Sequence, residues 1–423
     1  MEHDLVLGGR VVTPGGVEDL EVGVSDGLVR EVGRALRGSR RIDAGRCLIF
    51  PGFIDLHVHL REPGWERKED FRTGTRAAAH GGVTAVVDMP NNPTPATTRG
   101  AVDLKARLAR EKAVVDVMLN GGVGEKMEDV ASISGRVVGY KLYMSETTGA
   151  SALPKGALGL VFNAVAATGK PLSVHCEDQE VLDETEAKTQ EASGAGTYPD
   201  VRPPRAETEA VRRVVAALRE TRGLRANVCH ASTAETLRLV RSGAEEGLKL
   251  SCEASLHHLY FSKKALLDNR LLRTNPPLRG EEDRTALLEG IGDSSVSFLV
   301  TDHAPHLEEE KEEQGVAGVP GLDDYSHVVS WLIRDRGVDP TVIARVASAN
   351  PAAYLGLGDR GEISPGKRAD FTVLDLRSPE MVRRDDVQSR CGWSPYEGRE
   401  FPGRARYTIV GGEPVLDDGE LAR

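Results

Sequence analysis

A repeated alternation of short apolar runs with helical segments spans the middle of the chain, and no other feature limits the possible folds so strongly. Amphipathic or alanine-rich segments, such as 101–112, 206–221 and 234–247, separate the runs. Strand and helix alternating eight times predict a parallel (β/α)8 TIM barrel. An open, doubly wound sheet is the alternative, but no glycine-rich dinucleotide fingerprint follows the first run. The eight strand-like runs are FIDLHVH (53–59), VTAVVDM (83–89), VVDVMLN (114–120), VVGYKLYM (137–144), PLSVHC (171–176), RANVCH (225–230), LKLSCEA (248–254) and VSFLVTDH (296–303).

The two ends of the chain differ from this middle. Residues 1–50 contain short strand-like runs separated by glycine turns, and the tail repeats the pattern at 369–376 and 405–419. We therefore expect residues 1–50 and 358–423 to pair into one small β-sandwich-like domain beside a barrel of residues 51–357. Two separate edge extensions of the barrel are the alternative.

The charge balance excludes some classes of partner. With 54 basic and 65 acidic residues, the chain has a formal net charge of −11, which argues against sequence-independent binding to nucleic acid or to an anionic membrane. No apolar run approaches the length of a membrane span, and the N-terminus lacks the features of a secretory signal. The five cysteines imply no disulfide framework, so we expect a cytoplasmic protein. The charged run 307–314 is expected to be a solvated loop or helix face.

Metal-binding side chains stand at the ends of four of the eight runs. His57 and His59 are two residues apart, and side chains at that spacing share one face of a strand. His175, His230 and Asp302 end three further runs, and the strand ends of a barrel meet at one mouth. Imidazole and carboxylate ligands suit Zn²⁺, although Mn²⁺, Co²⁺ or Fe²⁺ could bind the same set. The alternative is that each is an ordinary core or surface residue.

A lysine lies inside the apolar run at 137–144. Lys141 as a bare ammonium would be costly at a barrel mouth. An acidic partner, a depressed pKa for Schiff-base chemistry, or carbamylation by CO₂ would each relieve that cost. Carbamylation converts the amine into an anionic group that can bridge two metals, so the surrounding metal ligands favour it.

Eight motifs are spread along nearly the whole chain: PGFIDLHVHLREPG (51–64), GGVTAVVDMPNNPTP (81–95), YKLYMSETT (140–148), VHCE (174–177), CHAS (229–232), CEASLHHL (252–259), TNPPLR (274–279) and TDHAPH (301–306). Through these motifs the chain resembles the dihydroorotases of the amidohydrolase superfamily. This resemblance implies the reversible cyclisation of N-carbamoyl-L-aspartate to L-dihydroorotate and water, in pyrimidine biosynthesis.

The resemblance also implies roles for the metal-binding residues. One zinc would be held by His57, His59 and Asp302, and a second by His175 and His230. Carboxylated Lys141 would bridge the two zinc ions, and Asp302 would act as general acid and base.

A third zinc, held by Cys229 and Glu253 with His57, occurs in some animal relatives. Against it, neighbouring strand residues face opposite ways, so Cys229 and His230 should not both point inward unless the strand end twists. The alternative is that Cys229 packs as a small apolar residue and Glu253 makes a supporting hydrogen bond.

Substrate contacts follow from the same resemblance. Arg61, Asn91 and His306 would clamp the substrate carboxylate, and a guanidinium fork suits a carboxylate. Asn275 would meet the ring amide edge, and the backbone near Gly318 would be a further ring contact. Thr147 and Thr148 would close over the open-chain acid, or would instead cap a helix. These seven positions are read from the motifs around them.

Sibling enzymes and a non-catalytic protein are the competing interpretations. Hydantoinases and allantoinases share the metal ligands, but allantoinases typically carry an uncharged residue at the position of Arg61. Some dihydroorotase-like chains have lost metal ligands and serve as scaffolds for aspartate transcarbamoylase, whereas every ligand is present here. A homo-oligomer and association with aspartate transcarbamoylase stay open, because no interface signal is apparent in the sequence.

Overall fold

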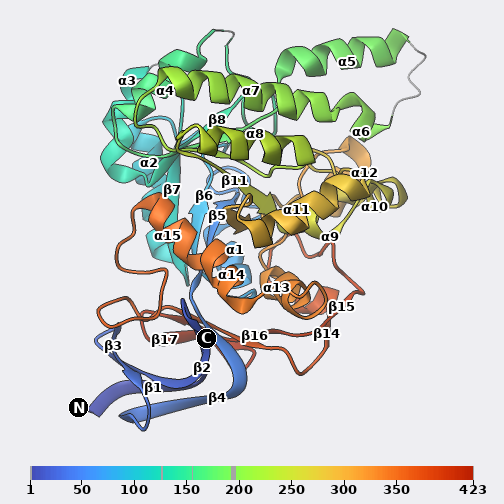
Figure 1. The fold of residues 1–423 in the computed structure, drawn as a ribbon. Helices are drawn as coiled ribbons and strands as arrows, with labels where there is room; N and C mark the ends of the chain where they lie inside the picture. Colours follow the sequence, from blue (N-terminus) through green and yellow to red (C-terminus); the bar gives the residue numbers. More distant parts are fainter. Residues whose placement is uncertain (1, 125–126, 155, 192–196, 423) are drawn as a thin grey trace.

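The computed structural model describes residues 2–124, 127–154, 156–191 and 197–422, which form two large sheets and a set of surrounding helices (Figure 1). The first sheet joins the two ends of the chain, in the order β18-β17-β16-β13-β4-β1-β2-β3. Its strands are β1 (Glu2–Thr13), β2 (Gly16–Ser25), β3 (Leu28–Gly33), β4 (Arg37–Pro51), β13 (Phe371–Asp375), β16 (Arg404–Val410), β17 (Glu413–Asp417) and β18 (Glu420–Leu421).

Pairing between β4 and β13 unites the ends of the chain. The two strands run antiparallel, with Phe371 opposite Pro51, and β1 lies parallel to β4 on the other side. Val22, Ile49 and Ile409 are buried in the hydrophobic cluster of this sheet. The prediction that both ends pair is therefore confirmed, and the alternative of two separate extensions is wrong.

The second sheet is the barrel. In the part of the chain that the structure describes, its eight strands follow in sequence order from β5 to β12, and every pair within the sheet is parallel. A backbone bridge between Val58 and His303 closes the ring, with the His59 amide 2.7 Å from the His303 carbonyl. The strands are β5 (Phe53–Val58), β6 (Val83–Asp88), β7 (Asp116–Gly122), β8 (Gly139–Tyr143), β9 (Leu172–His175), β10 (Ala226–Val228), β11 (Leu250–Ser255) and β12 (Phe298–Val300). The predicted barrel is confirmed, and the doubly wound alternative is wrong.

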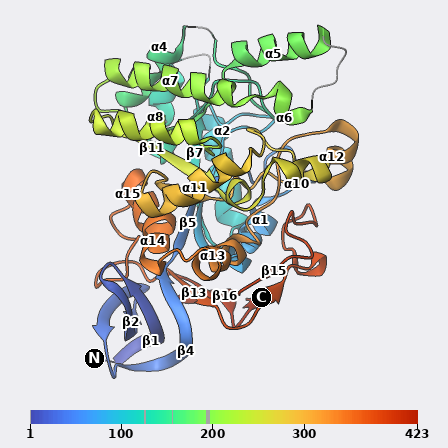
Figure 2. The same ribbon diagram turned by 45° about the vertical axis from the view of Figure 1, so that its right-hand side comes forward.

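Helices cover the outside of the barrel, while the sheet of the chain ends lies at one side of it in both views (Figures 1 and 2). The helix predicted over 206–221 is α7, which buries Val211, Val214 and Leu218 at helical spacing. The helices are α1 (Phe71–His80), α2 (Arg99–Lys112), α3 (Met127–Ile133), α4 (Leu158–Ala166), α5 (Gln179–Glu191), α6 (Tyr198–Val201), α7 (Pro204–Glu220), α8 (Ala234–Glu245), α9 (Leu256–Tyr260), α10 (Lys263–Asp268), α11 (Glu281–Asp293), α12 (Glu308–Gln314), α13 (Tyr325–Arg334), α14 (Pro340–Ala344) and α15 (Asn350–Leu355).

Smaller elements complete the chain. A two-stranded sheet pairs β14 (Glu380–Met381) with β15 (Glu400–Phe401). Short 3-10 turns lie at Ser134–Arg136, Arg270–Leu272 and Arg384–Asp386, and a π-helical turn at Arg345–Ala349 precedes α15.

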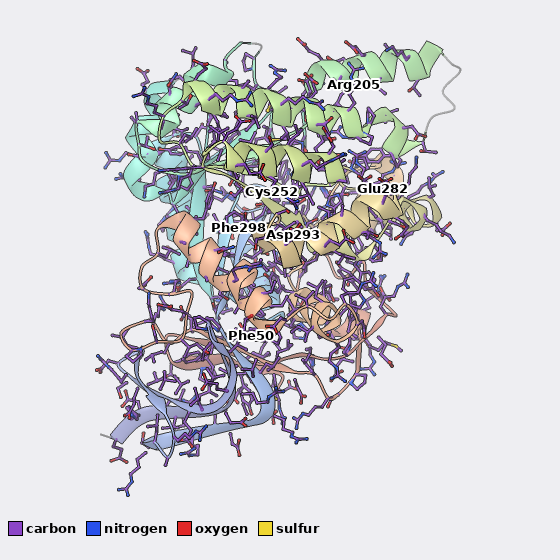
Figure 3. The ribbon with its side chains drawn as sticks, in the orientation of Figure 1. Phe50, Arg205, Cys252, Glu282, Asp293 and Phe298 are labelled. Carbon is purple, nitrogen blue, oxygen red and sulfur yellow. The ribbon has the colours of Figure 1, made fainter. Side chains whose placement is uncertain are left out.

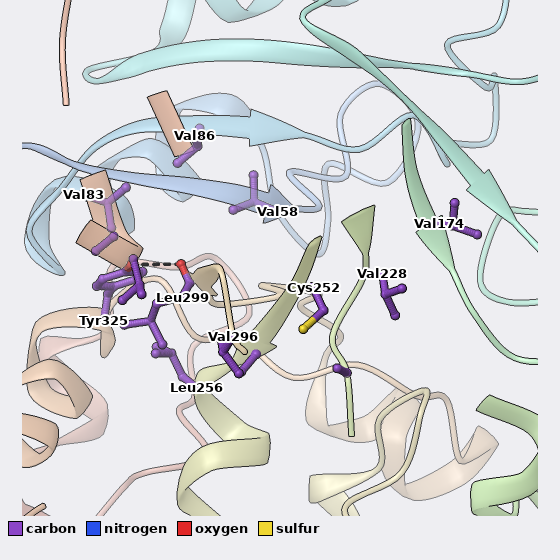
Figure 4. Close-up of a cluster of buried hydrophobic side chains, with 14 of the residues drawn as sticks. Val58, Val83, Val86, Val174, Val228, Cys252, Leu256, Val296, Leu299 and Tyr325 are labelled. Atoms are coloured by element: carbon purple, nitrogen blue, oxygen red, sulfur yellow. Dashed lines mark hydrogen bonds between the residues drawn. The ribbon is translucent and has the colours of Figure 1, made fainter. Parts of the chain in front are cut away.

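Apolar side chains from the strands and from neighbouring helices pack together in the core (Figure 4). Tyr325 on α13 donates a hydrogen bond from its hydroxyl to the Leu299 carbonyl, at 3.1 Å. Phe50 on β4, labelled in Figure 3, packs against Phe53 with ring centroids 5.3 Å apart. Phe53 in turn contacts Tyr325, so an aromatic chain joins the chain-end sheet to the barrel.

The charged run at 307–314 is helix α12, and it differs from the sequence expectation. Glu310 and Lys311 are buried, at 8% and 2% exposure. The expected solvated helix face is present at Glu309 and at residues 312–314, which are exposed, but the expectation is wrong for Glu310 and Lys311. Among the described residues, no helix is both long and apolar enough to cross a membrane.

Candidate metal centre and substrate pocket

The strand ends bring the predicted metal-binding residues together at one mouth of the barrel. Three atoms form one compact group: the Nε2 atoms of His57 and His59 each lie 3.3 Å from Asp302 Oδ1. In a tetrahedral zinc site with metal–ligand distances near 2 Å, ligand atoms lie about 3.3 Å apart. The donor set and its spacing therefore fit a single divalent ion.

Hydrogen bonds to the outer nitrogens orient both rings of this group. His59 Nδ1 lies 2.7 Å from Asn91 Oδ1, and His57 Nδ1 pairs with Glu253. An Nδ1–H donated to an oxygen leaves Nε2 with its lone pair directed inward, as a metal requires.

A second pair of imidazoles faces the same space. His175 Nδ1 lies 3.0 Å from His230 Nε2, which is also close to the separation of two ligands on one metal. The Nε2–H of His175 donates a hydrogen bond to Glu177 Oε2 at 3.0 Å, and Arg202 Nε donates to Oε1 of the same carboxylate at 3.1 Å. Burial alone would raise the pKa of Glu177, but Arg202 and His175 lower it overall, so an ionised carboxylate holds the ring of His175.

Left-handed backbone conformations direct several of these side chains. Arg61, His230 and Asp302 have φ angles of 61°, 35° and 48°, a region that side chains other than glycine seldom adopt and that clusters at functional sites. At His230 the turn lets two successive residues point inward. Cys229 Sγ lies 2.8 Å from Lys141 Nζ, while His230 faces His175. Cys229 therefore lies beside Lys141, and its role as a metal ligand or as a small packed residue stays a prediction.

Glu253 takes part in two arrangements. It accepts a hydrogen bond from Asn227 Nδ2 at 2.7 Å and pairs with His57, as expected of a supporting residue. Together with His57 and Cys229 it also forms a group whose ligand atoms all lie within 4.8 Å of one another. Among the described residues, two sets of three side chains could thus hold a metal ion: His57 with His59 and Asp302, and His57 with Cys229 and Glu253.

Lys141 is buried at 1% exposure among these ligands. Its Nζ lies 3.3 Å from His57 Nε2 and 5.2 Å from the ring centre of Tyr143. Among the residues that the structure describes, no carboxylate forms an ion pair with this ammonium. Of the three ways to accommodate a buried lysine, a directly paired carboxylate is thus absent from this part of the chain, although the charge of Lys141 acts to lower the pKa of both Glu253 and Asp302. A cavity of about 470 Å³ reaches Lys141 and Asn91.

Burial keeps the imidazoles in the neutral form that binds metals. It lowers the pKa of all four histidines, with a further contribution from Lys141 at His57 and from Arg61 at His59. For Asp302, burial raises the pKa of the carboxyl group. An uncharged imidazole is the ligand form, so the electrostatics of the histidines agree with the geometry, whereas the raised pKa of Asp302 opposes its ionised ligand form.

The predicted carboxylate clamp lies next to this group. Arg61 is 3% exposed; its Nε donates to the Pro305 carbonyl at 3.1 Å, and its Nη2 lies 3.1 Å from His306 Nε2. Burial lowers the pKa of Arg61 to about 10, so the guanidinium stays cationic near neutrality. Burial and the Arg61 charge lower the pKa of His306, which stays neutral. Two of the three clamp residues are thus adjacent, whereas the Asn91 side chain bonds His59 and the Thr148 carbonyl.

The remaining predicted contacts lie on loops around the mouth. Asn275 Oδ1 accepts a hydrogen bond from the Tyr198 hydroxyl. A Cβ atom at Gly318, where φ is 130°, would lie 2.5 Å from the Ala304 carbonyl oxygen, so only glycine fits there. Thr147 and Thr148 belong to a tight turn in which the Thr147 amide donates to the Ala150 carbonyl. Since α4 begins only at Leu158, the helix-cap alternative for these threonines is wrong, and their role in loop closure stays a prediction.

Comparisons with known proteins place the chain in a family. A model of the amidohydrolase family matches residues 48–415. The chain belongs to the amidohydrolase family. It is 34% identical to a dihydroorotase of Methanothermobacter thermautotrophicus over 409 residues, covering 95% of this chain and 92% of the relative. It is also 34% identical to an allantoinase of Rubrobacter xylanophilus, over 99% and 95% of the two chains. The structure of an L-hydantoinase (dihydropyrimidinase) from Arthrobacter aurescens matches with a TM-score of 0.94 at 25% identity, covering 100% of this chain and 98% of that one.

This amidohydrolase site also contains residues that the sequence analysis missed. Glu177 and Arg202 support His175, and Tyr198 holds Asn275. The only available signal was Glu177, two residues after His175 on the same face. Arg202 and Tyr198 come from the excursion between β9 and α7, and no local pattern marks them.

Proposed function

We propose that this amidohydrolase is a dihydroorotase, which interconverts N-carbamoyl-L-aspartate and L-dihydroorotate. Overall identity does not decide the substrate, because a relative named dihydroorotase and one named allantoinase are equally similar. The buried cation of Arg61, two residues after a predicted metal ligand and 3.1 Å from His306, carries the proposal. Dihydroorotate has a carboxylate on its ring, and allantoin has none to balance such a charge.

The donor set supports a site for two zinc ions. His57, His59 and Asp302 would hold one, His175 and His230 the other, and carboxylated Lys141 would join both. Burial of Lys141 without a described carboxylate in direct ion-pair contact supports this modification, because the carbamate replaces a cation that would repel the metals. When bound, zinc would lower the pKa of water and polarise the amide carbonyl of the substrate.

The side chains then divide the remaining tasks. Arg61 and His306 bind the substrate carboxylate and orient the ring. Asp302, with its pKa raised by burial, accepts a proton and returns it to the leaving amide nitrogen. Asn275 meets the ring amide, and the loop with Thr147 and Thr148 covers the open-chain acid.

Domain organisation is a second part of the proposal. Residues 51–357 would form the catalytic unit, and residues 1–50 with 358–423 would form the accompanying β unit. The pairing of β4 with β13 supports this division.

Parallel turnover assays on L-dihydroorotate, hydantoin and allantoin test the proposed substrate. Zinc content and the mass of the peptide containing Lys141 should be measured on the same preparation. We expect dihydroorotate to be strongly preferred, with bound zinc and one added CO₂ on that peptide. Preference for an uncharged ring would assign the chain to a sibling activity. A zinc-free protein without turnover, after supply of zinc and bicarbonate, would favour the scaffold interpretation.

A further inference from the structure

Lys311 is a buried cation that neither the metal centre nor the substrate clamp accounts for. It lies on α12 at 2% exposure. Its ammonium donates to three backbone carbonyls, those of Arg273, Val316 and Gly318, at 3.2, 3.2 and 2.6 Å. Among the described residues no carboxylate pairs with it. An ammonium has three N–H donors, so these carbonyls use all of them.

The three carbonyls belong to two loops that carry predicted substrate contacts. Arg273 lies two residues before Asn275 in the chain, and its carbonyl also accepts the Gly318 amide at 2.9 Å. Gly318 itself packs against the Ala304 carbonyl and the His306 ring. Lys311 thus holds the Asn275 loop and the Gly318 loop to each other.

A third element reaches the same cation from the end of the chain. Lys311 Nζ lies 5.8 Å from the ring centre of Trp393. The Trp393 indole N–H donates to the His306 carbonyl at 2.8 Å. The loop that carries His306 is therefore held by a side chain that also packs on Lys311.

The charges around Lys311 make this arrangement sensitive to protonation. Burial, then Arg273 and Arg61, lower the pKa of Lys311 to about 7, while Cys391 opposes this shift. Burial raises the pKa of the Cys391 thiol to about 12, so that group stays neutral. A neutral amine has two N–H donors and a lone pair, which would face one of the three carbonyls.

We propose that Lys311 is a positioning residue that sets the spacing of the Asn275, Gly318 and His306 loops, and thereby the affinity for the acidic substrate. The inference rests on the proposed function, because it concerns the pocket for that substrate. Its effect is expected in KM rather than in kcat, since Lys311 contacts neither the predicted metal ligands nor Arg61.

The test compares Lys311→Met with Lys264→Met in the zinc-loaded enzyme, using L-dihydroorotate. Lys264 is an exposed lysine on α10, so the same chemical change serves as a control. We expect Lys311→Met to raise KM by about tenfold or more while kcat changes by less than about threefold. The KM of the parent enzyme should rise as the pH increases through about 7, and this rise should be absent in the variant. Lys264→Met should behave like the parent.

Two further variants keep the inference testable if Lys311→Met folds poorly. Lys311→Arg retains a positive charge at every pH examined and should remove the pH dependence of KM. Trp393→Phe keeps the ring but removes the donor to His306, and it should raise KM by a smaller factor. Parental pH dependence of KM in Lys311→Arg, together with an unchanged KM in Trp393→Phe, would overturn the inference.

Hydrogen exchange of the segment 315–319 separates this inference from the proposed function. It is measured without substrate, so it does not depend on which ring the enzyme opens. Faster exchange in Lys311→Met would support the positioning role even if dihydroorotate is not turned over. Exchange equal to that of the parent would overturn it even in an active dihydroorotase.

Discussion

Replacing Arg61 with methionine would remove the guanidinium and keep most of the apolar stem. In the structure, the Nε–H of Arg61 donates to the Pro305 carbonyl, and one N–H of its Nη2 points at His306. Three of the five N–H donors are left, two on Nη1 and one on Nη2. This outer edge can offer a carboxylate two parallel hydrogen bonds.

The expected loss follows from those two bonds. A hydrogen bond to a charged group contributes about 1.5–3 kcal/mol, so losing two costs about 3–6 kcal/mol in transition-state binding. At about 1.4 kcal/mol per tenfold change, kcat/KM for dihydroorotate should fall by a factor of about 10² to 10⁴. Loss of the bond to Pro305 adds a smaller cost in stability, about 1–3 kcal/mol.

The assay compares dihydroorotate with dihydrouracil, which has the same ring without the carboxylate. Arg61→Met should reduce kcat/KM for dihydroorotate and leave the slow turnover of dihydrouracil nearly unchanged. Arg107→Met, at an exposed position on α2, is the matched control for removal of an arginine. An equal loss on both rings would mean that Arg61 acts through the metal centre, and the clamp argument would be refuted.

Three further substitutions test other parts of the site. Asp302→Asn should retain much of the bound zinc yet lose several orders of magnitude in kcat, measured with metal analysis; near-parental turnover would rule out its role in proton transfer. Glu177→Gln should weaken zinc binding by about 10–100-fold in a chelator competition, because the support of His175 is lost; unchanged affinity would contradict this. Gly318→Ala should lower the free energy of unfolding by about 1–3 kcal/mol, whereas Gly292→Ala, with open space around it, should not; equal stability of the two variants would speak against the steric argument.

The barrel could be predicted because its strands are continuous in sequence. Six of its strands, such as β5 and β12, are buried along their whole length, so apolar composition marks them without knowledge of their neighbours. His57 and His59 were visible for the same local reason, since strand geometry alone places them on one face.

Features that depend on unusual backbone angles or on distant partners could not be predicted in this way. Side chains alternate along a strand, which predicts that only one of Cys229 and His230 points inward. The left-handed conformation of His230 lets both side chains point inward. Lys311 has glutamates on both sides in the sequence, which predicts an exposed residue. Its ammonium is instead buried, because backbone carbonyls from two other segments accept its hydrogen bonds. Threonine is a common residue at the start of a helix, but no helix begins at Thr147 or Thr148.

The bond from Trp393 to the His306 carbonyl has a consequence for biosynthesis of the enzyme. A ribosome completes every predicted metal ligand, the last being Asp302, some ninety residues before it adds this tryptophan. The full set of predicted metal ligands is therefore present in a nascent chain before the His306 loop can have this support.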